Sequence, residues 1–563
     1  MTSRQFAAAL LAIVLLALAL RVVFPAADPP WRSTVGVVWH DEGAWTHNAR
    51  NKALFGAWRQ DEWNPVYIAP VFTALEYASF EAFGVGVRQA RLVSQIAGTI
   101  SVLLLALGVR RLAGRMAGLL AGGLLATNYV YVMYDRAAIM EALMVAFIVA
   151  SWYCSTRAGK TPAWGAAAGV MAALAFFTKA SAAFYVGALG LVAVVGLVRR
   201  HAAADDPVPS RAAWWTIGGL AASFALVAVL FVLPHWTDYQ FYNWQMSVTR
   251  KPSYDVASLV TRLSWFPVIH DMFTRMWPAV CLGLFGAWGI AARWRRAGDG
   301  ERLLLAWIAI GSLELLLHDV GNERRFVFLI PGFVALAAIV LARGSLLPAE
   351  AAAVSRTRLL LAAPALLYSA YVLLGPLTRV PFLDQVRANS FRMPVRIAAA
   401  GAVVLAIALL LGWARSARAF TVTRWGPRAA AVFLAAAMIW NVAQFVEWAA
   451  YRSYENYAAS IAIGRVLPPG TPVQGKLANG LALENRIRPI FIGHEFGNYA
   501  DRKQRWDVRY ILTYTDPYLG YEGSQIKDVL EAYPGWRITM TFDVSETPSG
   551  HDTAALIEKR ARD

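Results

Sequence analysis

An acidic pair follows the first apolar run of the sequence, within Trp39-His40-Asp41-Glu42-Gly43. Two adjacent carboxylates can supply a general base and a partner for it, or they can ligate a metal. The alternative is a solvated acidic loop or a helix N-cap, because Asp41 precedes a helix-like stretch over 43–55. A lone His beside an acid is more often a hydrogen-bond partner than a metal ligand. On this spacing alone the loop or cap interpretation of Asp41 and Glu42 is favoured, and a catalytic pair remains open. If the pair is catalytic, we expect His40 to orient a substrate, with no certain cofactor; a divalent metal is the alternative.

Five basic residues lie at the ends of apolar runs, on the side of the acidic pair: Arg91, Arg136, Lys179, Arg324 and Arg325. A charge costs about 2.5–3.5 kcal/mol at the centre of a bilayer and less near the interface. Snorkelling to the lipid headgroups therefore explains Lys179 and Arg136 as well as a function does. The pair Arg324-Arg325 lies on the side where short loops carry few cations, which favours binding of a phosphate over a role in topology.

Glu141 is an acid within an apolar run. On a continuous helix at about 100° per residue it shares a face with Tyr134 but not with Arg136. An acid that faced lipid would be costly, so we expect Glu141 and Tyr134 to face the interior of a helix bundle. A structural hydrogen bond and a contact that orients a substrate both remain open for them.

The composition limits the class of protein that can present these residues. The 563 residues are 58% hydrophobic and 16% charged, and the mean hydropathy is +0.45. Soluble globular chains are roughly 45–50% hydrophobic and about 25% charged. The composition therefore excludes a soluble enzyme, a disordered chain and a fibrous repeat. Cys154 and Cys281 both lie in or beside apolar runs, so the sequence contains no disulfide framework. We predict an α-helical polytopic membrane protein.

The apolar runs predict about 13 transmembrane helices. Clusters of Arg at 110–115, 157–160, 199–211, 293–302, 343–358 and 415–428 all fall on one side, together with the N-terminus. Short Arg-rich loops stay cytoplasmic, so we expect a cytoplasmic N-terminus and an outer C-terminus in the inner (plasma) membrane. The net charge of +17 then largely reflects topology, and nucleic acid is not an expected partner. The predicted spans are 6–24, 88–108, 115–133, 135–155, 162–177, 182–198, 212–234, 277–292, 301–318, 326–342, 357–375, 396–413 and 429–447.

Two outer loops and the tail are more polar than the runs. We expect a transmembrane catalytic domain over 1–450, with outer loops at 27–86 and 235–276, and a small extracytoplasmic α/β domain over 451–563. The first run is expected to be an uncleaved anchor. The tail elements are predicted as helices 455–465, 479–486 and 525–532 and strands 472–476, 489–492, 509–515 and 537–542.

Several short motifs occur in a fixed order along residues 21–180. Asp41-Glu42 follows the first span, and Ala90-Arg91-Leu92 opens the second. Tyr134-Asp135-Arg136, followed by Glu141, opens the fourth, and Phe177-Thr178-Lys179 ends the fifth. This order resembles the GT-C membrane glycosyltransferases, in the branch of the protein O-mannosyltransferases and the lipid A aminoarabinose transferase. The later spans resemble that superfamily in number and arrangement only.

The resemblance implies transfer of a sugar from a polyprenyl-phosphate donor to an acceptor hydroxyl on the outer face, with inversion at the anomeric carbon. Asp41 matches the general base and Glu42 the second acid, which orients the acceptor or assists. Lys179, Arg324 and Arg325, together with Arg136 and Arg91, are the candidates for binding the donor phosphate. The acceptor on a lipid, a glycan or a protein stays open, as does the sugar. The alternatives are a carrier or flippase of a lipid-linked saccharide and a non-catalytic scaffold for the tail.

Overall fold

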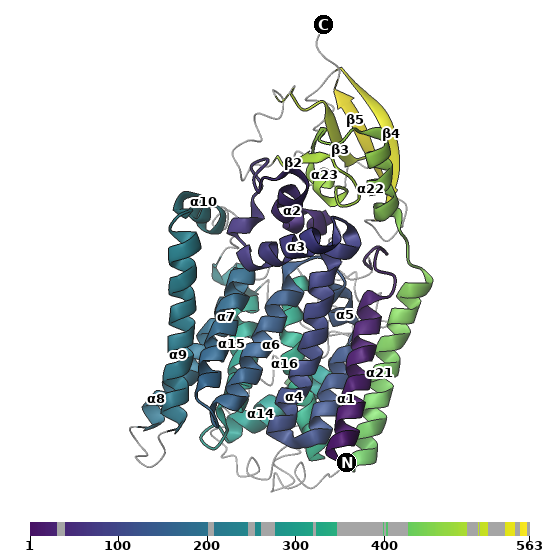
Figure 1. Ribbon diagram of the computed structural model, residues 1–563. Coiled ribbons are helices and arrows are strands. Elements are labelled where there is room, and N and C mark those ends of the chain that lie inside the picture. The colour runs from purple at the N-terminus through teal and green to yellow at the C-terminus, as the bar shows by residue number, and fades with distance from the viewer. Residues whose placement is uncertain are drawn as a thin grey trace.

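The computed structural model describes residues 1–30, 40–200, 208–245, 254–260, 276–318, 323–345, 398, 401–402, 426–492, 505, 507–515, 535–545 and 552–559. In these ranges the chain forms a bundle of apolar helices with a small α/β domain at one end, and the N-terminus lies at the other end (Figure 1). The bundle contains α1 (Ser3–Val22), α4 (Val87–Thr127), α5 (Tyr129–Asp135), α6 (Met140–Ala158), α7 (Ala163–Thr178), η2 (Ala180–Ala182), α8 (Ala183–Arg200), α9 (Val208–Val227), η3 (Ala228–Val232), α10 (Trp236–Gln240), η4 (Phe241–Gln245), α14 (Trp277–Ala292), α15 (Asp299–His318), η5 (Glu323–Leu329), α16 (Ile330–Arg343) and α21 (Pro427–Ala450).

Six helical segments of the described ranges are long and apolar enough to cross a bilayer, and a seventh is reached if α5 and α6 count as one bent span. The prediction of a multi-pass helical membrane protein is thereby confirmed, whereas the number 13 stays a prediction. The expected span at 357–375 lies outside the described residues, and only 398, 401 and 402 of the span at 396–413 are described.

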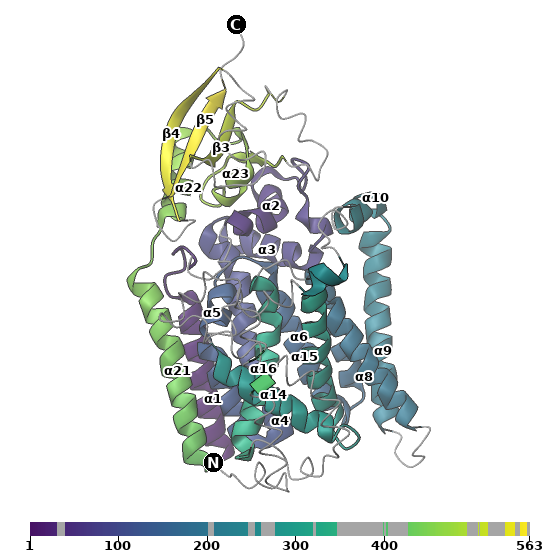
Figure 2. The ribbon, with the colours of Figure 1, turned by 180° about the vertical axis from the view of Figure 1, so that it is seen from behind.

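The bundle is densely packed around α4, α6 and α16. The fully buried indoles of Trp152 and Trp307 lie in its core, and each donates its N–H to a backbone carbonyl. Seen from behind, α8 and α9 lie at one edge of the bundle and α1 and α21 at the other, with α14, α15 and α16 between them (Figure 2). These packed helices fix the positions of the side chains at their ends.

Helix α4 reverses its direction at Gly114, where φ is +90° and ψ is 177°. This is a conformation that glycine adopts readily and other residues rarely do. The second half then packs so closely on the first that a Cβ added at Gly118 would lie 2.6 Å from the carbonyl oxygen of Ala106. The two predicted spans with a basic turn between them are thus confirmed as a helical hairpin.

The chain breaks between α5 and α6, and the two helices meet at an angle of 113°. α5 begins after Asn128, whose side chain accepts a hydrogen bond from the N–H of Tyr131, and it ends at Asp135. The prediction that Tyr134 and Glu141 share one helix face is therefore wrong, because it assumed an unbroken helix. Glu141 lies instead in the first turn of α6.

A polar layer separates the bundle from the C-terminal domain. It consists of α2 (His40–Phe55), η1 (Pro65–Tyr67) and α3 (Pro70–Phe83), which lie between the two parts in Figure 1. Ten of the sixteen residues of α2 are buried although most of them are polar. Buried polar groups must be hydrogen-bonded, so this helix is fixed by specific partners on several sides.

The C-terminal domain contains one five-stranded sheet in the order β2-β1-β3-β5-β4. β1 pairs in parallel with β2 and β3, and β5 pairs antiparallel with β3 and β4. Its elements are α22 (Glu455–Val466), β1 (Pro472–Gln474), α23 (Lys476–Gly480), β2 (Arg488–Ile490), β3 (Tyr510–Tyr514), β4 (Trp536–Val544) and β5 (Asp552–Lys559).

The small α/β architecture of the tail is confirmed, with differences in two elements. The helix expected at 479–486 is wrong: α23 ends at Gly480, and the chain then turns. The strand β5 is missing from the sequence prediction, although it joins β3 to β4. The helix expected at 525–532 lies outside the described residues.

Candidate active site

Four charged residues from four separate elements meet near the beginning of α2. Arg324 Nη1 of η5 donates to Asp41 Oδ2 of α2, and Arg324 Nε lies 3.5 Å from Glu141 Oε1 of α6. Lys179 Nζ, at the end of α7, donates to the same oxygen of Glu141. Two acids and two cations thus form one continuous network, which we call the charged cluster.

Each member of the charged cluster lies where a helix begins or ends. Glu141 is in the first turn of α6, where the positive end of the helix dipole favours an acid. Lys179 follows the last residue of α7 and is extended, with φ −158° and ψ 121°, so its side chain leaves the helix axis. Arg324 lies in the 3₁₀ helix before α16. The ends of these helices converge and bring the charges together.

The charged cluster is partly open to solvent. The side chains of Asp41, Lys179 and Arg324 are 14%, 17% and 21% exposed, whereas that of Glu141 is fully buried. Partly desolvated charges interact more strongly than charges in water, yet a ligand can still reach three of the four. This combination is suited to binding and reacting with a charged substrate.

Glu42, the second acid of the pair, has an entirely different environment. Arg91 holds it with two hydrogen bonds of 2.7 Å, and the N–H of Ala138 donates to it over 2.7 Å. Arg91 also donates to the carbonyl oxygens of Pro25 and Ala27 at 3.0 and 2.6 Å. Both charged side chains are buried. Glu42 and Arg91 therefore connect α2, α4 and the break between α5 and α6 and lie outside the charged cluster.

Arg136 is bound to the end of α1. Its guanidinium donates to the carbonyl oxygens of Leu20, Arg21 and Phe24 at 2.9 to 3.0 Å. Next to it, Arg21 and Asp135 form a fully buried ion pair of 2.7 Å. The structure thus places Arg136 among carbonyl groups and does not bring it into the charged cluster.

The remaining predicted site residues border the charged cluster. His40 is buried, with Nε2 3.7 Å from Asp41 Oδ1. Tyr134 is buried in α5 close to Arg324. Arg325 is half-buried and donates to the carbonyl oxygen of His318 at 2.7 Å. In the described part of the chain, no three His, Cys, Asp or Glu residues lie close enough together to hold a metal.

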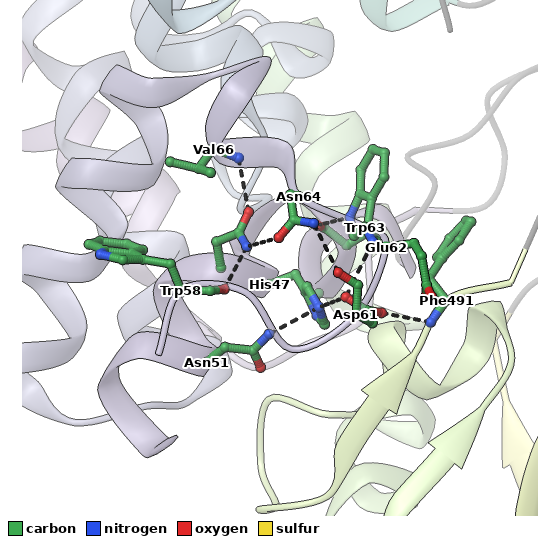
Figure 3. Close-up of polar contacts among 12 residues, drawn as sticks. His47, Asn51, Trp58, Asp61, Glu62, Trp63, Asn64, Val66 and Phe491 are labelled. Atoms are coloured by element: carbon green, nitrogen blue, oxygen red, sulfur yellow. Dashed lines mark hydrogen bonds and ion pairs between the residues drawn. The ribbon is translucent and has the colours of Figure 1, made fainter. Parts of the chain in front are cut away.

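A polar network on α2 was not anticipated from the sequence. Asn48 donates to the carbonyl of Trp58 and to Asn64 at 2.7 and 3.0 Å, and it accepts from the N–H of Val66 at 2.9 Å. These bonds fold the segment after α2 back onto the helix (Figure 3). The sequence signal that could have indicated this network is the density of His and Asn residues within α2.

Glu76 is a second acid that sequence reasoning missed. It lies on the buried face of α3, fully covered, and neither carboxyl oxygen has a hydrogen-bond partner among the described residues. Burial, and to a lesser degree the charge of Glu42, raises the pKa of Glu76 well above its ordinary value of 4.5. Glu76 is therefore neutral over a wider pH range than an exposed glutamate.

Comparison with known proteins places this geometry in context. Residues 67–237 match the family model of the dolichyl-phosphate-mannose-protein mannosyltransferases. The crystal structure of ArnT from Cupriavidus metallidurans bound to undecaprenyl phosphate is 16% identical, with a TM-score of 0.53, over 98% of this chain and 97% of that chain. Its apo form is also 16% identical, with a TM-score of 0.50, over 97% of both chains. The Archaeoglobus fulgidus oligosaccharyltransferase in its apo form is 12% identical, with a TM-score of 0.47, over 91% of this chain and 70% of that chain.

A search of curated protein sequences gave no match. At 16% identity the likeness to ArnT shows a common fold, and it extends over almost the whole of both chains. The family match adds a sequence relationship over the region that carries Glu141 and Lys179. The chain thus has the fold of ArnT, and residues 67–237 resemble the dolichyl-phosphate-mannose-protein mannosyltransferases in sequence.

Proposed function

We propose that the chain transfers a sugar from a polyprenyl-phosphate donor to an acceptor hydroxyl, with inversion at the anomeric carbon. The observation that carries the proposal is the charged cluster, in which two acids and two cations converge beside the polar layer. The mannosyltransferase family match and the undecaprenyl phosphate bound to ArnT support a lipid-linked donor.

In this proposal Lys179 and Arg324 bind the donor phosphate. As the bond between the anomeric carbon and the phosphate oxygen breaks, its electron pair leaves with the polyprenyl phosphate. Positive groups aimed at such a developing charge are usually the largest contribution to catalysis. In the described structure these cations contact Asp41 and Glu141, so the phosphate has to compete with two carboxylates for them. Arg325, Arg136 and Arg91 have contacts elsewhere, and we assign them no part in this step.

Asp41 is the proposed general base. It accepts the proton of the acceptor hydroxyl while the oxygen attacks the anomeric carbon from the face opposite the phosphate. Its carboxylate is partly exposed and contacts Arg324, which is also partly exposed. Glu42 has its oxygens occupied by Arg91 and Ala138, so it serves to position Asp41 and not to bind the acceptor.

The proposed topology has the N-terminus in the cytoplasm and the charged cluster and C-terminal domain outside, in a plasma membrane. The opposite placement of the N-terminus and that domain on the bundle supports it (Figure 1). The acceptor hydroxyl belongs to a lipid, a glycan or a protein on that face.

The test uses the full chain in lipid nanodiscs with undecaprenyl-phosphate-linked sugars and an envelope extract as a mixture of acceptors. We expect the sugar to leave the carrier lipid and free undecaprenyl phosphate to accumulate. Undecaprenyl phosphate should also bind more weakly to the Lys179→Met variant. Movement of intact donor across the bilayer without sugar transfer would support the carrier alternative, and failure to bind undecaprenyl phosphate would contradict both.

A further inference from the structure

The C-terminal domain packs against one stripe of α2. Gly43, His47 and Arg50 contact it directly or through one residue, and they lie within about 60° of each other around the helix. At the same spacing of 100° per residue, Asp41 lies about 160° from Gly43, on the opposite side of the helix. The domain therefore supports the back of the helix whose front carries the proposed base.

Gly43 lies where the two parts approach closely. A Cβ added at Gly43 would overlap the backbone carbonyl of Asn479, in α23 of the C-terminal domain. A backbone group cannot move aside as a flexible side chain can, so any side chain here must displace α2 or α23. Gly43 is two residues from Asp41, and such a displacement would reach the charged cluster.

Arg50, at the other end of this stripe, connects α2 to the C-terminal domain by hydrogen bonds. Its Nε donates to the carbonyl of Ala482 at 3.0 Å, and its Nη2 donates to those of Asn485 and Ile487 at 3.0 and 2.9 Å. The side chain is buried, and this burial lowers the pKa of the guanidinium to about 9. The ring of Phe55 also lies 5.8 Å from the guanidinium carbon. A buried cation hydrogen-bonded to carbonyl groups contributes little net stability, but it fixes the geometry of what it connects.

Two further contacts hold the same elements. Asp61 accepts from the N–H of Phe491 at 2.7 Å and lies 2.8 Å from His47 Nε2, so it lies between α2 and the domain (Figure 3). Glu484 accepts from the N–H of Val87 at 2.7 Å, at the start of α4. α4 also carries Arg91, which holds Glu42. The domain thus contacts both helices that position Asp41.

We propose that the C-terminal domain contributes to catalysis by positioning α2. Arg50 is the positioning residue: through it the domain fixes α2, and with it Asp41, relative to Arg324. The proposal rests on the function proposed above. A displacement of about 1 Å in a reacting group can lower a rate by roughly 10²-fold. The domain then affects the rate of transfer without contacting the donor.

The experiment compares variants in the full chain. Arg50→Met keeps the length of the side chain and removes the three hydrogen bonds. We expect kcat to fall by about ten-fold or more, with an unchanged dissociation constant for undecaprenyl phosphate, because Lys179 and Arg324 lie on other elements. Arg50→Lys should restore part of kcat. Lys52→Met is the matched control: Lys52 lies on the same helix and donates to the carbonyl of Gly56, within the same segment.

A milder variant protects the test against a folding defect. Asp61→Asn keeps the shape of the side chain and weakens the contact with Phe491, so we expect a smaller fall in kcat than in Arg50→Met, measured at temperatures where the variant is folded. Hydrogen exchange at the amides of α2 is measured in parallel and should accelerate in Arg50→Met but not in Lys52→Met. Full kcat in both Arg50→Met and Asp61→Asn would overturn the proposal. If even the unaltered chain transfers no sugar, the proposed function fails, while hydrogen exchange still reports whether the domain holds α2.

Discussion

Asp41 and Glu42 are neighbours in the sequence, yet the structure places them in two different kinds of site. Glu42 is buried and held by three hydrogen bonds from Arg91 and Ala138, all 2.7 Å long. Asp41 is partly exposed and shares Arg324 with a second acid. One acid is fixed in place, and the other can exchange its partner for a substrate. Adjacent residues of the same chemical type can therefore divide structure and chemistry between them.

The largest effect is expected at Asp41. Asp41→Asn keeps the size of the side chain but removes the base, and a positioned base contributes about 10²–10⁴-fold to such a reaction. Transfer should fall by that order in a steady-state assay. Binding of undecaprenyl phosphate should not weaken, because Arg324 loses a competing carboxylate. Full transfer activity in this variant would show that the base lies elsewhere, with Glu141 the next candidate.

Glu42→Gln should lower the stability of the fold more than the rate of transfer. The amide cannot accept both hydrogen bonds from Arg91, which leaves a buried cation without its full counter-charge. Breaking a buried pair in this way costs about 3–5 kcal/mol of stability. We expect a lower melting temperature and a smaller loss of transfer than in Asp41→Asn at temperatures where the variant is folded. A Glu42→Gln protein that melts normally but is inactive would assign Glu42 to the chemistry and remove the contrast.

The two cations of the charged cluster should act on donor binding. Charge-assisted contacts are worth roughly 1.5–3 kcal/mol each, so Lys179→Met and Arg324→Met should each weaken binding of undecaprenyl phosphate about ten-fold or more. Arg452→Met is a suitable control, since Arg452 is an exposed arginine near the same end of the bundle. Equal affinities in all three variants would mean that Lys179 and Arg324 serve only to hold Asp41 and Glu141.

The smallest effect is expected at Glu76, and it concerns stability. Its pKa is raised in the folded protein, so its contribution to stability is fully present below about pH 4.5 and is lost as pH rises toward the folded-state value. Glu76→Gln removes the charge that burial disfavours and should stabilise the protein by about 1–3 kcal/mol at neutral pH. Melting curves at pH 7.5 and pH 5 should show the gain shrinking at the lower pH. A gain independent of pH would contradict the assignment.

Local sequence patterns predicted much of the architecture. The apolar runs predicted the bundle, and the basic turn at 110–115 marked the hairpin within α4. The break between α5 and α6 was not predictable in this way, because the residues on both sides of it are equally apolar. The sequence of β5, which ends in Glu558 and Lys559, is equally compatible with a helix. Its pairing with β3 and β4 decides its conformation.

The candidate site was predictable as a set of residues but not as an arrangement. Asp41, Lys179 and Arg324 could be named from their positions at the ends of apolar runs. The contact between Asp41 and Arg324 joins residues 283 positions apart, which no local spacing can indicate. The same holds for Arg50, whose carbonyl partners lie more than 430 positions along the chain. Only the fold distinguishes the arginines that bind backbone carbonyls from the one that meets Asp41.

The central claim is that the charged cluster is the reaction centre, and a structure of the full chain with bound undecaprenyl phosphate tests it most directly. The account predicts phosphate oxygens within hydrogen-bond distance of Lys179 Nζ and the guanidinium of Arg324. The carboxylate of Asp41 should be released from that arginine and separated from the phosphate by the space that the sugar occupies. A phosphate bound elsewhere on the outer end of the bundle, with the contact between Asp41 and Arg324 intact, would contradict it.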